Sequence, residues 1–173
     1  MNKQIFIING SGRVGKDTFV KFITIEMAQI TKKIRSVENV SSVDEIKNIA
    51  RMLGWKGGKS EKDRRFLSDL KVLTSKYNGF PFKSIKSKVE EFRQDDTTNI
   101  LFLHIREPEE IQRAVDEFGA KTILIKRDNV KHITSNMADK NVFNYEYDYV
   151  IENNGTKEEF KEKAREFFTG VCQ

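Results

Sequence analysis

The sequence predicts an α/β protein in which a parallel sheet of five strands is covered by helices on both faces. Short apolar segments alternate with amphipathic segments along the chain, as in consecutive strand–helix–strand units. Segments 99–105 (NILFLHI) and 121–126 (KTILIK) are almost wholly apolar, which is typical of strands buried on both faces. A glycine-containing turn follows the first apolar segment. In such a sheet, a ligand binds at the carboxyl ends of the strands.

The first half of the chain supplies two of the predicted strands. Segment 4–8 is apolar and β-branched, and the helix after the glycine turn has apolar residues at helical spacing. Segment 33–40 is predicted as a second, short strand. The apolar residues of the first helix are Phe19, Phe22, Ile23, Met27 and Ile30.

A helical insert is predicted over residues 42–95. Ser42 and Glu45 have the spacing of a capping box for a first helix that ends near Gly54, and Ser60 with Asp63 begins a second. In the second helix an apolar stripe is expected opposite a polar side. The stripe comprises Phe66, Leu70, Leu73 and Tyr77, and the polar side comprises Arg64, Ser68, Lys71 and Ser75. A third helix is marked by Ile85, Val89 and Phe92.

The second half of the chain continues the alternation. Pro108 suits the first turn of a helix that ends at Gly119. Residues 127–147 have no clean period and are too long for a simple turn, so they are interpreted as a functional irregular segment, a lid over the donor. A short strand at 149–151 and an amphipathic helix through Phe160 and Phe168 close the fold.

Composition limits the class of protein. The chain has 173 residues and is expected to form one domain, 1–173, and its net charge of +5 suits a small anionic ligand. Nucleic acid is not the expected partner, and a homodimer is left open. Without an apolar run long enough for a membrane span, or a signal peptide, a cytoplasmic location is expected. The single cysteine, Cys172, excludes an intrachain disulfide.

The segment NGSGRVGKDT predicts a phosphate-binding loop. Gly10, Gly15 and Lys16 match the pattern G-x-x-x-x-G-K directly after a buried strand and before a helix. Backbone N–H groups of such a loop converge on phosphate oxygens, and the helix N-terminus adds partial positive charge. The nucleotide-binding residues predicted here are Gly10, Ser11, Gly12, Arg13, Val14, Gly15, Lys16, Asp17 and Thr18.

The stretch SGRVGKDT resembles the phosphate loop of phage-type deoxynucleoside monophosphate kinases, in the adenylate-kinase-like branch of P-loop kinases. Asp17 and Thr18 would reproduce the arrangement after the lysine in adenylate kinases. Animal phosphomevalonate kinases have a similar GKD. LFLHIREPEEIQRAVDEFGAKTILIKR and YDYVIENNGTKEEF are similar to later strands and helices of these kinases, and insert 42–95 occupies the position of their monophosphate-binding region.

The resemblance implies transfer of the γ-phosphate of ATP, with Mg2+, to a small phosphorylated acceptor, most readily a (deoxy)nucleoside monophosphate. Lys16 would contact the outer phosphates, and Arg106, just after a buried strand, would contact the transferred phosphoryl group rather than a carboxylate of Glu109 or Glu110. Lys59, Arg64 and Lys71 would contact the acceptor phosphate or, alternatively, remain solvated. Arg127, Lys131 and Lys140 would form the lid over residues 127–147, which lacks the arginine pair of adenylate-kinase lids.

One departure concerns the metal. His104 stands where P-loop enzymes place an Asp at the end of a strand, and a core or lining histidine is the favoured interpretation. Asp17 is the candidate to hold a metal-bound water, or it is a helix-start acid. Two alternatives to the monophosphate kinase stay open. The similarity of GKD to phosphomevalonate kinases keeps open a kinase for another small metabolite, and His104 together with the lid that lacks the arginine pair keeps open a nucleotide-binding regulatory protein without transfer activity.

Overall fold

The computed structural model describes residues 2–32, 37–128 and 141–171. Its strands form one sheet in which every neighbouring pair is parallel, in the order β2-β3-β1-β4-β5. This confirms the predicted five-stranded parallel sheet. The strands are β1 (Gln4–Asn9), β2 (Val37–Ser41), β3 (Ile100–His104), β4 (Lys121–Lys126) and β5 (Tyr149–Glu152).

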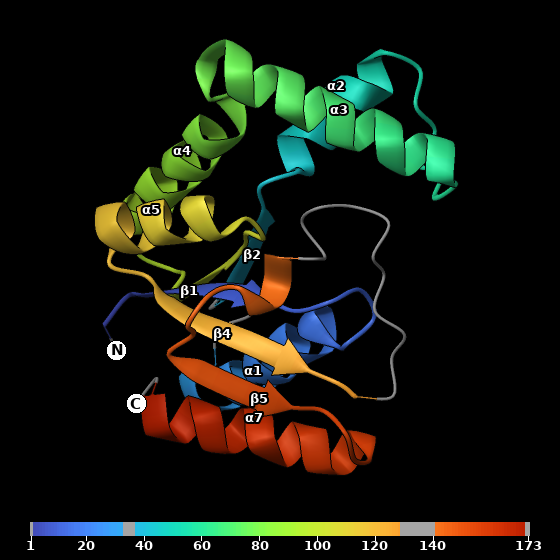
Figure 1. The fold of residues 1–173 in the computed structure, drawn as a ribbon. Helices are drawn as coiled ribbons and strands as arrows, with labels where there is room; N and C mark the ends of the chain where they lie inside the picture. The colour runs from blue at the N-terminus through green and yellow to red at the C-terminus, as the bar shows by residue number, and fades with distance from the viewer. Residues whose placement is uncertain (1, 33–36, 129–140, 172–173) are drawn as a thin grey trace.

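Helices cover both faces of the sheet (Figure 1). On one face lie α1 (Lys16–Thr31) and α7 (Lys157–Val171), and on the other lie α4 (Phe80–Gln94) and α5 (Pro108–Phe118). Two further helices, α2 (Asp44–Met52) and α3 (Glu61–Asn78), project beyond the sheet together with the start of α4 (Figure 1). A short 3-10 helix, η1 (Asn141–Phe143), precedes β5.

The alternation of side chains along β1 creates the two cores. Phe6 and Ile8 point to the face covered by α1 and α7, whereas Ile7 points to the face covered by α4 and α5. All three are at most 1% exposed. Because both faces are packed, the strand must be apolar at every position, which is why NILFLHI and KTILIK lack alternation.

The predicted turn chemistry is largely confirmed. Ser60 and Asp63 form a reciprocal capping box at the start of α3. Gly79 and Gly119 end α3 and α5 in the left-handed conformation, with φ of 69° and 68°. Pro108 is the first residue of α5.

The predicted capping box of Ser42 and Glu45 is wrong. Helix α2 begins at Asp44 after Val43, and no side chain caps its N-terminus. Instead, the Asp44 carboxylate accepts the backbone N–H of Ser41 at 2.8 Å. The spacing of Ser42 and Glu45 was misleading because the carboxylate at the first helical position, Asp44, accepts a backbone N–H at the end of β2 instead of one in the helix.

The predicted faces of α3 are also wrong in part. Leu73 and Tyr77, expected in the apolar stripe, are 65% and 86% exposed, and α3 has no fully buried residue. Lys71, expected on the solvated side, is half-buried and turns toward α5. Because α3 packs on α2 and α4 outside the sheet, its inner side is set by those contacts. None of the helices in the described ranges combines the length and apolar character of a membrane span.

Candidate functional site

The glycine loop, residues 10–15, connects the carboxyl end of β1 to α1, and its backbone requires glycine at two positions. Gly10 has φ of 144° and Gly15 has φ of 106°. A Cβ atom at Gly10 would lie 2.5 Å from the Ile125 carbonyl oxygen, and one at Gly15 would lie 2.7 Å from Nδ2 of Asn153. The spacing of these glycines therefore reflects close approach of neighbouring elements as well as conformation.

The N-terminus of α1 follows the loop with no side-chain cap. Gly15 is the N-cap residue, so within the described residues the helix begins without a capping side chain. The N–H groups of that turn, together with the partial positive charge of the helix, favour an anion at this point. This geometry suits the predicted binding of phosphate by residues 10–18.

Lys16 is folded back over the glycine loop. Its ammonium group donates hydrogen bonds to the carbonyl oxygens of Gly10 and Ser11, the latter at 2.9 Å. The positive charge thus lies against the concave backbone where a phosphate would bind. A phosphate in the loop could exchange with these carbonyls as the partner of the ammonium.

Asn153 supports the loop from β5 and is a residue that the sequence analysis missed. Its side chain is 7% exposed, and Nδ2 donates a hydrogen bond to the Val14 carbonyl oxygen at 2.8 Å. An asparagine directly after a predicted strand was the available signal. Its contact with the loop could not be predicted, because it depends on the position of β5 beside β4.

His104 lies at the carboxyl end of β3, beside the first turn of α1. Burial lowers the pKa of His104 to about 4, so the imidazole is neutral near pH 7. Nε2 lies 2.7 Å from Oδ1 of Asn39 on β2 and 3.9 Å from the Asp17 carboxylate. Because Oδ1 of Asn39 can only accept, Nε2 carries the hydrogen. Asn39 was missed because only the pairing of β2 with β3 brings it to His104.

Asp17 is in the first turn of α1, and its side chain is 91% exposed. It is therefore available to solvent next to the glycine loop. Within the described ranges, no three His, Cys, Asp or Glu side chains are grouped as a metal site would require. Among the described residues, Asp17 is thus not part of a preformed metal cage.

Arg106 comes two residues after β3, and its backbone carbonyl accepts a hydrogen bond from Nδ2 of Asn9 at 3.3 Å. Asn9 is the last residue of β1 and is fully buried. The start of the glycine loop and the segment carrying Arg106 are thereby joined at neighbouring strand ends. The structure thus brings Arg106 to the same edge of the sheet as Lys16.

Lys71 of α3 contacts the segment that follows Arg106. Its ammonium lies 2.7 Å from Glu107 and 2.9 Å from Glu110, and its side chain is 12% exposed. Burial opposes ionisation of both acids. The Lys71 ammonium nevertheless holds the pKa of Glu107 below its usual range, whereas burial and the Glu107 charge leave the pKa of Glu110 raised. Lys71 is therefore neutralised by carboxylates in this structure.

The other predicted cations are placed differently. Lys59 and Arg64, near the start of α3, are exposed, and Arg127 is exposed just after β4. Lys131 and Lys140, predicted for the lid, lie outside the described residues. The structure therefore brings Lys16, Asp17 and Arg106 to one edge of the sheet and leaves the contacts of Lys59 and Arg64 with an acceptor as a prediction.

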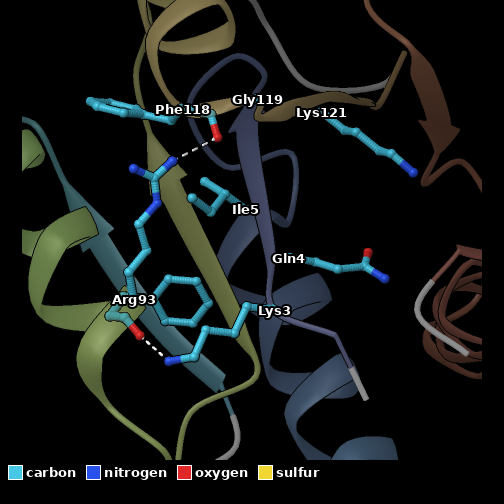
Figure 2. Close-up of a pocket in the computed structure, with 8 residues that line it drawn as sticks. Lys3, Gln4, Ile5, Arg93, Phe118, Gly119 and Lys121 are labelled. Atoms are coloured by element: carbon cyan, nitrogen blue, oxygen red, sulfur yellow. Dashed lines mark hydrogen bonds between the residues drawn. The ribbon is translucent and has the colours of Figure 1, made fainter.

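A separate hollow of about 350 Å³ lies at the opposite ends of the strands (Figure 2). Two of its basic side chains satisfy the ends of helices. Lys3 donates to the carbonyl oxygens of Phe92 and Asp95 near the end of α4, and Arg93 donates to that of Phe118 at 3.2 Å. Cations commonly satisfy the last carbonyls of helices in this way. The hollow is therefore explained by packing and is not part of the candidate site.

No protein-family model matches the sequence, and neither does any curated protein sequence. Among solved structures, shikimate kinase from Aquifex aeolicus is similar with a TM-score of 0.53 and 12% identity over 98% of each chain. The chain has the fold of P-loop kinases.

Two further structures are similar at lower scores. A protein structure from Chloroflexus aurantiacus has a TM-score of 0.48 and 10% identity over 98% of this chain and 97% of that one. Thymidylate kinase from Ehrlichia chaffeensis has 0.35 and 12%, over 99% and 87%.

Proposed function

We propose that this protein transfers the γ-phosphoryl group of ATP to a small phosphorylated acceptor, with a (deoxy)nucleoside monophosphate as the acceptor class. The observation that carries the proposal is the glycine loop. Gly10 and Gly15 have positive φ angles that favour glycine, and the Lys16 ammonium donates hydrogen bonds to carbonyl oxygens of the loop. This loop lies at the carboxyl ends of the strands in a P-loop kinase fold. The resemblance of SGRVGKDT to monophosphate kinases supports the acceptor class.

The reaction needs no covalent intermediate. The glycine loop and the uncapped N-terminus of α1 hold the donor phosphates, and Lys16 balances charge on the outer ones. Arg106 contacts the phosphoryl group as it moves, which stabilises charge on its oxygens. The contribution of the protein is therefore position and electrostatics.

Mg2+ fits this site only as a partner of the nucleotide. Magnesium in phosphoryl-transfer sites commonly takes one or two protein oxygens, substrate phosphates and water. The Asp17 carboxylate and the Thr18 hydroxyl are the oxygen donors at the start of α1, and the neutral His104 replaces the usual carboxylate. When bound, the ion would offset negative charge on the phosphates, with Asp17 holding it directly or through water.

The acceptor side is formed by the insert. Arg64 and Lys59 are exposed cations suited to an acceptor phosphate, whereas Lys71 would first have to leave Glu107 and Glu110. The resemblance of the GKD stretch to phosphomevalonate kinases keeps another small phosphate compound as an alternative acceptor. Arg127, Lys131 and Lys140 remain the candidates for a lid over the donor.

A second candidate function is nucleotide binding without transfer. The observation that favours it is His104, because a neutral imidazole bonded to Asn39 supplies no negative charge to a metal shell. Such a protein would use the same glycine loop to sense a nucleotide.

A coupled assay with ATP, Mg2+ and a panel of acceptors separates these candidates. The panel comprises dTMP, dGMP, dCMP, UMP, AMP, mevalonate 5-phosphate and shikimate. We expect transfer to at least one monophosphate, and a loss of about a hundredfold in turnover for Arg106→Ala with little change in ATP affinity. Arg113→Ala, on the exposed side of α5, is the control and should retain turnover.

Binding of ATP by the unaltered protein without transfer to any compound of the panel would favour the regulatory function. Equal losses of turnover and of folded protein in Arg106→Ala would assign Arg106 a structural role.

A further inference from the structure

Asn9 connects the glycine loop to two other segments through a fully buried side chain. Its Oδ1 accepts the backbone N–H of Gly10 at 2.8 Å, and its Nδ2 donates to the Tyr147 hydroxyl at 2.7 Å and to the Arg106 carbonyl oxygen at 3.3 Å. Every polar atom of this side chain thus has a partner. The partners come from the segments that follow β1, follow β3 and precede β5.

Tyr147 fixes the orientation of this amide. Its hydroxyl donates to the Val142 carbonyl oxygen at 2.8 Å, and a carbonyl can only accept. The hydroxyl oxygen must therefore accept from Nδ2 of Asn9, which turns Oδ1 toward Gly10. Burial raises the pKa of Tyr147 to about 12, so the hydroxyl keeps its proton at physiological pH.

The hydrogen bonds continue from Gly10 to Lys16. The N–H of Gly10, in the peptide that joins it to Asn9, donates to Oδ1 of Asn9. The carbonyl oxygen of Gly10, in the next peptide, accepts a hydrogen bond from the Lys16 ammonium. The backbone conformation at Gly10, between these two peptides, therefore sets the position of the charge that would meet the donor phosphates. A chain of hydrogen bonds runs from Val142 through Tyr147, Asn9 and Gly10 to Lys16.

We infer that Asn9 and Tyr147 are positioning residues for the phosphate site, holding the backbone at Gly10, and through it Lys16, in register with the segment that carries Arg106. Neither residue touches the reacting atoms. The inference rests on the proposed function for its nucleotide. It adds that residues 142–147, before β5, help to set the geometry of the donor site.

The test compares Tyr147→Phe with Tyr145→Phe. Each variant loses one hydroxyl from neighbouring rings, whose centroids are 5.1 Å apart, but the Tyr145 hydroxyl bonds to Gln112 at 3.1 Å and not to Asn9. Two quantities are measured well below the melting temperature: hydrogen exchange of the Gly10 amide by NMR, and ATP affinity by calorimetry.

Tyr147→Phe removes two hydrogen bonds, of which the one from Asn9 acts on the loop. Gly10 exchange should be about fivefold faster and ATP binding about fivefold weaker, as expected for loss of that one bond to the network. Tyr145→Phe should change each by less than about twofold. A role in global stability alone would not change the affinity of the folded protein.

The inference is overturned if Tyr147→Phe matches Tyr145→Phe in both measurements. It is also overturned if Gly10 exchange rises while ATP affinity stays unchanged, because the network would then not set the site. An unaltered protein that binds no ATP would contradict the proposed function instead, and the Gly10 exchange comparison would still decide whether Tyr147 holds the loop. Asn9→Ser, which retains a shorter polar group, should show both effects more strongly if it folds.

Discussion

At the residue scale, His104 links the candidate site to pH. Burial lowers the pKa of His104 to about 4 from 6.5. Between these values the unfolded chain binds more protons than the folded one, so stability rises with pH. The contribution of His104 is complete above pH 6.5 and is lost as the pH falls from 6.5 to about 4.

We therefore predict a difference in acid stability between the unaltered protein and His104→Gln. From pH 7 to pH 4, the free energy of unfolding of the unaltered protein should fall by up to about 3 kcal/mol more than that of the variant. Urea titrations at several pH values measure the free energy of unfolding of both proteins. Subtracting one profile from the other removes the effect of the carboxylates that both proteins share. Parallel pH profiles would show that His104 is not the responsible group.

Gly15 in the glycine loop has little space for a side chain, which allows a prediction by comparison with Gly54. Gly15 and Gly54 both have positive φ, 106° and 93°, but a Cβ at Gly15 meets Nδ2 of Asn153 and the Phe160 ring, whereas one at Gly54 meets nothing within 4 Å. Gly54→Ala should cost about 1 kcal/mol of stability from backbone strain alone. Gly15→Ala should cost at least about 2 kcal/mol because strain and a clash combine.

Thermal and urea unfolding of the two glycine variants give the comparison. Equal losses would mean that Asn153 and the Phe160 ring move aside without cost, and that conformation alone requires the glycine at position 15.

At the element scale, Lys71 connects α3 to the beginning of α5. Its removal would leave Glu107 and Glu110 close together and partly buried. Lys71→Met should therefore cost about 1–2 kcal/mol at pH 8, and less at pH 5, where one carboxyl can take up a proton. The control is Arg65→Met, because Arg65 lies 3.8 Å from Asp69 on the exposed side of the same helix and should change stability by less than about 0.5 kcal/mol.

Two measurements on Lys71→Met distinguish its roles. If Lys71 mainly joins the insert to α5, Lys71→Met lowers the free energy of unfolding, and a double-mutant cycle gives a stabilising interaction energy between Lys71 and Glu110. The acceptor KM then changes little. A raised acceptor KM with unchanged stability would instead support the predicted contact with the acceptor phosphate.

At the scale of the whole molecule, nucleotide binding should stabilise the fold by mass action. At an ATP concentration of 100 times the dissociation constant, the gain is about 2.7 kcal/mol, or about 5–10 °C in melting temperature for a chain of this size. Lys16→Ala should lose most of this shift, because the outer phosphates lose their ammonium partner. Lys21→Ala, exposed on the same helix, should keep it.

Differential scanning fluorimetry with and without ATP·Mg2+ measures these shifts. No shift with ATP, GTP or their diphosphates in the unaltered protein would mean that the glycine loop binds no nucleotide.

The sequence alone determined the architecture and the loop. Strands buried on both faces must be apolar throughout, glycines at positive φ have few substitutes, and Pro108 and Gly119 mark helix ends, so these local requirements are visible in a single chain. The strand at 121–126 was predicted with its observed bounds. These features depend on the residue and its immediate neighbours.

Only the tertiary structure decided which distant side chains meet. Asn39 reaches His104 because β2 pairs with β3, and Asn9 reaches Tyr147 because the segment before β5 folds back over the end of β1. Lys71 turned inward because the carboxylates of α5 lie beside α3, which reversed its expected side. Such contacts join residues far apart in sequence, and neither periodicity nor spacing carries information about them, because they are fixed by the relative placement of whole elements.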